Sequence, residues 1–109
     1  MGDMARWIKI ADVADCPPGE ARELVAEDRI VALFHVEGEF YALDGVCPHQ
    51  GGPLGKGQLE GCVLTCPWHG WQFDVRSGQH QFSQNVVQPS FVVRVADGEV
   101  FVDLTSAPS

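Results

Sequence analysis

Two short segments, each with a cysteine followed by a histidine, constrain this 109-residue chain more than any other feature. The first segment holds Cys47 and His49, the second holds Cys66 and His69, and sixteen residues separate His49 from Cys66. A proline follows each cysteine and stiffens its loop, and glycines nearby let the backbone approach closely. The pattern predicts two tight loops that present two thiolates and two imidazoles to one shared centre.

Three interpretations of this set of ligands remain open at this point. A [2Fe–2S] cluster would place Cys47 and Cys66 on one iron and His49 and His69 on the other. A structural zinc ion would take the same four ligands in a tetrahedral Cys₂His₂ site. Zinc sites usually take two closely spaced cysteines from one segment and two closely spaced histidines from another, whereas each segment here holds one of each. The third interpretation is coincidence, which two such similar segments in one short chain make hard to sustain.

The net charge excludes several classes of partner. Seven Lys and Arg residues stand against fifteen Asp and Glu residues, which leaves a net charge of −8. Nucleic-acid binding needs clustered basic side chains for phosphate contacts, and anionic membrane surfaces attract basic segments. Neither nucleic acid nor a membrane is therefore expected as a partner.

The cysteines and the N-terminal segment suggest a compartment. Residues 1–10 lack the continuous apolar stretch of a signal peptide, and the longest apolar run, residues 30–34, is too short to cross a bilayer. We expect a soluble cytoplasmic protein, where thiols stay reduced and paired cysteines usually mean metal or redox chemistry.

Short β-like runs separated by Gly and Pro predict an all-β domain of about nine strands. Residues 37–39 and 96–99 read as the turns of two hairpins. Residues 44–60 carry five Gly and two Pro, so no regular structure is expected there, and residues 11–15 could form a helical turn. The expected strands cover residues 7–10, 21–25, 30–36, 40–43, 62–66, 71–75, 91–95 and 100–104.

The second segment and the residues after it resemble a known family. Trp71, Phe73 and Asp74 follow the second Cys-Pro segment, and a Ser77–Gly78 turn comes next, as in the second loop of Rieske proteins. The whole chain resembles the soluble Rieske-type [2Fe–2S] ferredoxins that serve bacterial oxygenases. The resemblance implies one Rieske domain over residues 1–109. Its antiparallel β-sandwich base would comprise residues 1–44 and 72–109, with a cluster-binding subdomain of two loops at about 45–71.

The resemblance also implies a cofactor and a role. Cys47 and Cys66 would hold the inner iron of one cluster, His49 and His69 would hold the outer iron, and residues 84–89 would cover the cluster. The chain would be a monomeric electron carrier and not an enzyme. It would pass one electron from an NAD(P)H-dependent flavin reductase to a terminal oxygenase. The charge of −8 would steer it toward basic patches on these partners.

Four positions depart from the Rieske proteins of respiratory and photosynthetic complexes. Their extra disulfide falls at Gly52 and Trp68 here, so it cannot form. Their Ser and Tyr hydroxyl donors fall at Trp71 and Phe73, which carry no hydroxyl. Hydrogen bonds to sulfur raise the reduction potential, so we expect a midpoint below about −50 mV, within a family range of about −150 to +300 mV.

Other cysteines and histidines have simpler interpretations. Cys62 lies too far along its strand to join Cys66 as a ligand, so a buried structural thiol is expected. Cys16, beside a proline turn, is expected to be an idle thiol. His35 is expected to be a half-buried strand residue, and His80 is expected to be exposed beside a turn.

Three rival classes remain open. The Rieske domain of a terminal oxygenase can carry the same second loop, but 109 residues leave no room for its catalytic iron domain. A small Rieske-like subunit of an assimilatory nitrite reductase would work in an assembly with a large subunit. A structural zinc module would be colourless, whereas a Rieske centre absorbs visible light.

Overall fold

The regular structure of the chain is almost entirely β. The computed structural model describes residues 7–47, 51–68, 70–83 and 85–105. In these residues no helix is long and apolar enough to cross a membrane. The nine strands are β1 (Trp7–Asp12), β2 (Ala21–Ala26), β3 (Arg29–Val36), β4 (Glu39–Asp44), β5 (Gln58–Glu60), β6 (Val63–Thr65), β7 (Gln72–Asp74), β8 (Ser90–Ala96) and β9 (Glu99–Asp103). Two single-turn 3-10 helices are η1 (Val13–Asp15) and η2 (Leu54–Lys56).

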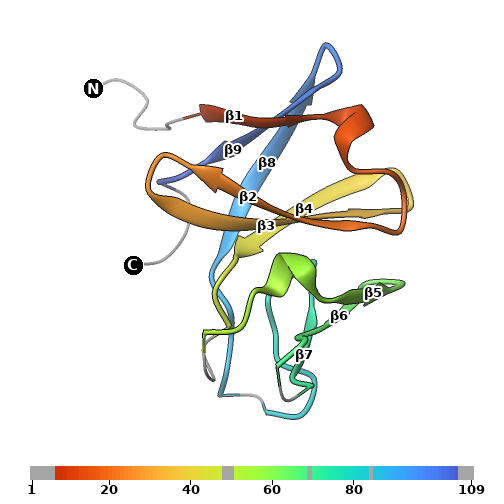
Figure 1. Ribbon diagram of the computed structural model, residues 1–109, viewed down its shortest axis with the longest axis vertical. Helices are drawn as coiled ribbons and strands as arrows, with labels where there is room; N and C mark the ends of the chain where they lie inside the picture. Colours follow the sequence, from red (N-terminus) through yellow and green to blue (C-terminus); the bar gives the residue numbers. More distant parts are fainter. Residues whose placement is uncertain (1–6, 48–50, 69, 84, 106–109) are drawn as a thin grey trace.

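The strands form two sheets, in which every neighbouring pair is antiparallel. Six strands pair in the order β1-β9-β8-β4-β3-β2, and three pair in the order β5-β6-β7. In Figure 1 the six strands make the upper body and the three short strands the lower one. We call residues 7–44 and 90–105 the base and residues 45–89 the small-sheet subdomain.

The six-stranded sheet folds on itself. β4 and β8 pair at only two positions, Ala42 with Phe91 and Leu43 with Ser90. This narrow join lets β1, β9 and β8 fold over β2, β3 and β4, and both halves supply side chains to one apolar core. The predicted all-β sandwich base is confirmed.

β3 is buried on both faces, which explains the apolar run at residues 30–34. Val31 and Leu33 point into the core of the base. Ala32 and Phe34 point the other way, into a second core shared with the small-sheet subdomain. All four side chains are fully buried, because the alternation of a strand sends neighbours to opposite faces and each face here has a cover.

The second core attaches the small sheet to the base. Its buried members come from β3 and β4 on one side and from the lower body on the other. From the lower body they are Cys47, Leu54, Leu64, Cys66, Phe73 and Val75. Two cysteines therefore belong to the apolar layer that joins the two parts.

The two predicted hairpins have two-residue turns. Glu37 and Gly38 connect β3 to β4, and Asp97 and Gly98 connect β8 to β9. All four residues have positive φ, between 49° and 86°. Positive φ at both central positions gives the backbone twist that suits a tight antiparallel hairpin. Both predictions are confirmed.

Three sequence predictions about element boundaries were wrong. Residues 58–60 were expected to lack regular structure, but they form β5, which pairs with β6. A run of three residues is too short to show the alternation that predicts a strand. Ala11 and Asp12 continue β1, and only Val13–Asp15 is helical. The base was expected to resume at residue 72, but β7 pairs with β6, and the base resumes at β8.

Candidate functional site

Cys47 and Cys66 lie side by side in the second core. Their exposed fractions are 2% and 1%. Burial raises the pKa of the Cys66 thiol, a hydrogen bond from the Trp68 backbone lowers it, and the neighbouring Cys47 thiol raises it. The fold therefore brings together the two cysteines that the sequence singled out. The other two predicted ligands, His49 and His69, lie outside the described residues.

The first Cys-Pro loop turns back on itself immediately after Cys47. The N–H of Cys47 donates to the carbonyl of Gly52 at 2.8 Å, and the N–H of Gly51 donates to the carbonyl of Cys47 at 2.9 Å. Gly51 has a φ of +76°, which few other residues adopt without strain. The loop is closed by backbone bonds, so it needs no disulfide to hold its shape.

Gly52 leaves space beside the thiols. A Cβ atom added to Gly52 would lie 2.8 Å from the Sγ of Cys66 and 3.0 Å from the Cβ of Trp68. Any larger residue would press on the sulfur. All four cysteines of the chain are free.

Among the described residues, a backbone hydrogen bond between Cys66 and Trp71 closes the second Cys-Pro loop. The N–H of Cys66 donates to the carbonyl of Trp71 at 2.7 Å. β6 ends at Thr65 and β7 begins at Gln72, so the loop spans the gap between paired strands. The small sheet thus provides a rigid frame for Cys66.

Gln88, in a third segment, clamps the start of the first loop by hydrogen bonds, and sequence reasoning did not identify it. The side-chain amide of Gln88 donates to the carbonyls of Asp44 and Val46, each at 2.7 Å. Its own N–H donates to the carbonyl of Gly78 at 2.7 Å. Gln88 is buried, so these bonds satisfy groups that water cannot reach. A glutamine between a valine and a proline carries no sequence signal for this role.

His80 was predicted to be exposed, and that prediction was wrong. The backbones of His80 and Phe73 pair as an isolated antiparallel β-bridge. The His80 ring packs edge-on against Trp71, with 4.6 Å between ring centroids. The N–H of Phe82 donates to Nδ1 at 3.0 Å, so Nε2 carries the proton of the neutral ring. Nε2 is buried and has no hydrogen-bond partner among the described residues. Turn residues surround His80 in the sequence, but the tertiary fold covers it with aromatic rings.

His35 lies in a strand as predicted, but it is buried and not half-buried. It is buried in β3, its Nδ1 lies 2.7 Å from the carbonyl oxygen of Cys16, and its ring stacks on Phe40. These contacts belong to the base and place His35 away from the pair of thiols.

The remaining cysteines have different surroundings, since Cys16 lies in the core of the base and Cys62 packs against the second core from outside. Cys16 is fully buried in the core of the base, and burial raises the pKa of its thiol. Cys62, expected to be buried, is only partly so. It lies in the turn before β6 and lines a hollow of about 370 Å³ with Tyr41 and Arg76. The turn between β5 and β6 lies outside the paired strands, so Cys62 is less covered than a residue within the sheet.

The donors that the structure describes fit a cluster iron. Two buried cysteines have neighbouring thiols, a glycine leaves space beside the Cys66 sulfur, and backbone hydrogen bonds close both loops. Thiolates are the ligands of iron–sulfur clusters, and both thiols must lose their protons when a metal binds. The arrangement can hold one iron between two sulfurs and shield it from water.

Comparison with known proteins agrees with this chemistry. Residues 6–96 match the Rieske [2Fe-2S] domain family. The ferredoxin component of an alkene monooxygenase system from Xanthobacter autotrophicus is 36% identical over 97% of this chain and 88% of its own length. The ferredoxin component of a naphthalene 1,2-dioxygenase system from Pseudomonas putida is 32% identical over 92% of this chain and 97% of its own length.

A solved structure has the same fold. The matched chain comes from the complex of reduced oxygenase and oxidized ferredoxin in carbazole 1,9a-dioxygenase. It is 34% identical, with a TM-score of 0.81 over 89% of this chain and 92% of the matched chain. The cofactor of this family is the Rieske [2Fe–2S] cluster, which replaces the zinc interpretation. With its paired buried thiols and its match over residues 6–96, the chain belongs to the Rieske [2Fe-2S] domain family.

Proposed function

We propose that this protein is a one-electron carrier that takes electrons from an NAD(P)H-dependent flavin reductase and delivers them to a terminal oxygenase. The observation that carries the proposal is the buried pair Cys47 and Cys66 in a chain whose relatives are ferredoxin components of oxygenase systems. The cytoplasm, which keeps thiols reduced, is the compartment we assign to it.

The ligand assignment is part of the proposal. Cys47 and Cys66 would hold the inner iron, and His49 and His69 would hold the outer one. The cluster, when bound, supplies a centre that gains and loses a single electron. The chain contributes water exclusion around Cys47 and Cys66, and the neutral imidazoles of its histidines would face the partner.

A low reduction potential follows from the side chains around the second loop. Trp71 and Phe73 pack against His80 and offer no hydroxyl hydrogen bond to sulfur. Fewer donors leave the reduced state less stabilised, so the midpoint should lie below about −50 mV. Protein-film voltammetry checks this value, and a midpoint above about +100 mV would contradict it.

Ligand substitution tests the site directly. Cys47→Ser and His69→Ala should each lose iron, sulfide and visible colour, because each removes one ligand. Cys62→Ser and Cys16→Ser are matched controls, because Cys16 lies in the core of the base and Cys62 lies in the turn before β6, and both variants should keep the full cluster. Equal iron content in His69→Ala and the unchanged protein would refute the assignment of His69.

Spectroscopy and reconstitution test the role. EPR of the dithionite-reduced protein should give the low average g value of a centre with histidine ligands, distinct from all-cysteine ferredoxins. Purified flavin reductase, this protein and an oxygenase component should support substrate oxidation that stops when this protein is left out. Stable co-purification with a sirohaem protein would instead support the nitrite reductase alternative.

A further inference from the structure

His80 holds a buried hydrogen-bond donor that the contacts of the fold leave unused. The residue is only 8% exposed. Among the residues that the structure describes, Nε2 of His80 is the one buried side-chain nitrogen or oxygen that lacks a hydrogen-bond partner. A buried polar group without a partner costs about 1–3 kcal/mol, so each one in a folded protein calls for a reason, and a redox role is one such reason.

The loop after β7 fixes the proton and the direction of the His80 ring. The N–H of Phe82 donates to Nδ1 at 3.0 Å, so Nε2 carries the proton. The backbone N–H of His80 donates to the carbonyl of Val86 at 3.0 Å, which holds the residue in place. Phe82 is 79% exposed, and the two ring nitrogens point to different sides of an imidazole. The Nε2–H therefore points away from the exposed loop and into the protein.

Cross-strand pairing places His80 on the side of the small sheet that faces the second core. Leu64 of β6 pairs with Phe73 of β7, and Phe73 pairs in turn with His80. Residues paired across antiparallel strands project on the same side of a sheet. Leu64 and Phe73 are fully buried members of the second core, so His80 lies on the side that this core occupies.

Cys66 lies on the same side of the small sheet. Side chains alternate along a strand, so Cys66, two residues after Leu64, projects as Leu64 does. A hydrogen bond of 3.2 Å joins the side chains of Thr65 and Gln72 on the opposite side, as this alternation requires. Both Cys66 and Leu64 are members of the second core. The thiol and the unused donor of His80 thus share one side of the sheet.

Two aromatic residues of one segment lie between His80 and Cys66. The His80 ring packs edge-on against Trp71 and Phe73, with centroid distances of 4.6 Å and 5.3 Å. Trp71 accepts the backbone hydrogen bond of Cys66, so it lies next to that residue. Aromatic rings screen an electric field far less than water does, so the N–H dipole of His80 acts across them.

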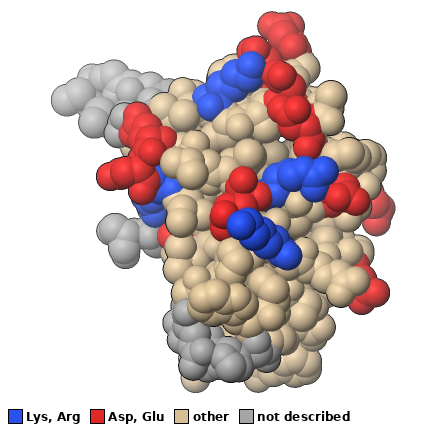
Figure 2. All heavy atoms as spheres, viewed as in Figure 1, with Lys and Arg blue, Asp and Glu red and all other residues tan. Residues whose placement is uncertain are grey.

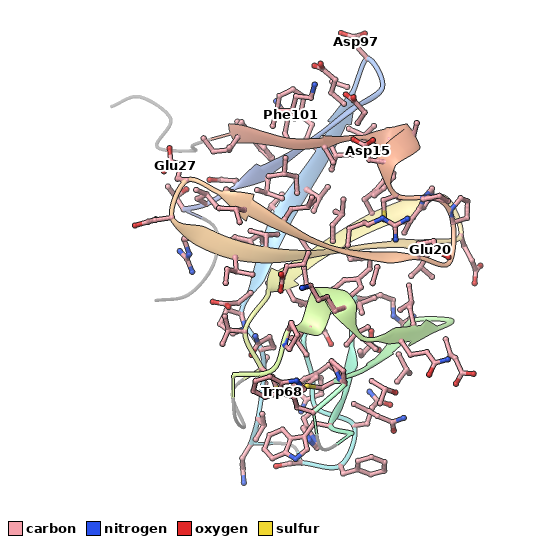
Figure 3. The ribbon with its side chains drawn as sticks, in the orientation of Figure 1. Asp15, Glu20, Glu27, Trp68, Asp97 and Phe101 are labelled. Carbon is pink, nitrogen blue, oxygen red and sulfur yellow. The ribbon has the colours of Figure 1, made fainter. Side chains whose placement is uncertain are left out.

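Ionised side chains are sparse in this part of the molecule. Residues 45–89 hold two acidic and two basic residues, whereas the base holds twelve acidic and four basic ones. Asp74 and Arg76 neutralise each other in a two-point ion pair, with distances of 3.0 Å and 2.8 Å. In Figure 2 red and blue atoms cover the upper part, and the described atoms at the lower end are tan. Figure 3 labels acidic residues on the base, and Trp68 at the other end. The dipole of His80 therefore competes with few full charges.

We propose that His80 raises the reduction potential of the cluster by turning the positive end of its buried N–H dipole toward the side of the small sheet that carries Cys66. The proposal rests on the proposed function, because it requires a cluster held by Cys47 and Cys66. Reduction adds one negative charge at the bound cluster, and the positive end of a dipole in a low-dielectric interior favours that charge. His80 thereby supplies part of the stabilisation that Trp71 and Phe73, which lack hydroxyls, do not supply.

Two amide side chains separate the two nitrogens of His80. Glutamine can place an N–H donor where Nε2 lies, but it has no atom in the place of Nδ1. Asparagine has an acceptor near the place of Nδ1, but it ends short of Nε2. His80→Gln should therefore keep the potential and lose the hydrogen bond from Phe82, whereas His80→Asn should keep that bond and lower the potential. His80→Phe removes both nitrogens.

Protein-film voltammetry of the iron-loaded proteins measures the effect. His80→Asn and His80→Phe should each lower the equilibrium constant for reduction by about threefold, which is about 30 mV for one electron. His80→Gln should match the unchanged protein. His35→Asn and His35→Phe are the matched controls and should leave the potential unchanged. His35 is also buried, bonded through Nδ1 and stacked on a ring, but it lies in the base.

Iron content and thermal unfolding, measured on the same variants, separate the dipole from a merely structural role. A structural role would make the potential follow the melting temperature, so His80→Gln would fall as far as His80→Phe. That result in fully loaded proteins, equal potentials in His80→Phe and the unchanged protein, or loss of iron from every His80 variant would each overturn the inference alone. If the unchanged protein gives no EPR signal of a histidine-ligated cluster, the proposed function fails, and the inference falls with it.

Discussion

The base and the small-sheet subdomain are built by different physical means. Strands of the base run five to eight residues and are held by long ladders and an apolar core. Strands of the subdomain run three residues each, and its loops are held by backbone bonds, a buried glutamine and glycines at close approaches. Regular structure gives the molecule stability, while the irregular part gives it a site, because metal ligands must come from loops that bend toward one point.

The two apolar cores test this difference between the base and the subdomain most directly. Leu33 lies in the core of the base and Leu64 in the core shared with the small sheet, and both are fully buried. Each change to alanine should cost about 2–5 kcal/mol of packing free energy. Leu33→Ala should weaken amide protection everywhere, whereas Leu64→Ala should weaken it mainly in β5, β6 and β7.

Native-state hydrogen exchange measures both variants. Equal loss of protection across base and subdomain in Leu64→Ala would mean that the two parts unfold together as one cooperative unit.

A glycine substitution tests the space beside the thiols. Gly52→Ala would place a Cβ atom 2.8 Å from the Sγ of Cys66, which should cost about 1–3 kcal/mol and lower the iron bound per chain to less than half. Iron and sulfide analysis with visible absorbance measures the loss. Gly98→Ala is the control, since its Cβ would meet open space at a strained φ in the base, and its cluster content should be normal. A fully loaded Gly52→Ala would show that the space is not needed.

The clamp from Gln88 predicts a local effect. Gln88→Leu leaves the carbonyls of Asp44 and Val46 without their buried donor, which should cost about 1–3 kcal/mol. Thermal unfolding should register this loss, and the midpoint potential should shift because the loop bearing Cys47 loses its anchor. Gln81→Leu, on an exposed neighbour, should change neither quantity. A normal melting temperature in Gln88→Leu would contradict the clamp.

The smallest effect concerns the ion pair of the subdomain. Hydrogen bonds from the Arg76 side chain lower the pKa of Asp74 below its ordinary value of 3.8. A carboxylate with a lowered folded pKa stabilises the fold above its unfolded pKa, and the contribution disappears as the pH falls through the folded pKa. Asp74→Asn should therefore cost less than about 1 kcal/mol at pH 7, because water screens the pair, and nothing at about pH 2.

Urea unfolding at both pH values measures the difference. Asp97→Asn, which removes a carboxylate from an exposed turn of the base, is the matched control. A cost for Asp74→Asn that is equal at both pH values would rule out the ion pair as its source.

Sequence reasoning recovered the all-β class and the cofactor chemistry, but it placed the return to the base at residue 72, whereas the base resumes at β8. The all-β class, the two hairpins and the place of His35 in a strand follow from local patterns: alternation, paired turn residues and an apolar run. Cys47 and Cys66 were found because two similar segments with metal-binding residues stand out in a short chain. Such signals lie within a few residues of one another, so they can be read without the fold.

Only the tertiary structure decided the contacts that join distant segments. β5 exists because β6 pairs with it, and His80 is buried because Trp71 and Phe73 cover it. Gln88 donates hydrogen bonds to residues more than forty positions away in the sequence, and no local sequence pattern predicts a contact at that separation. The charged residues can be counted in the sequence, but only the fold shows that residues 45–89, which hold two acidic and two basic residues, lie at one end of the molecule. Local patterns record what a segment prefers, whereas burial and partners depend on what the rest of the chain brings to it.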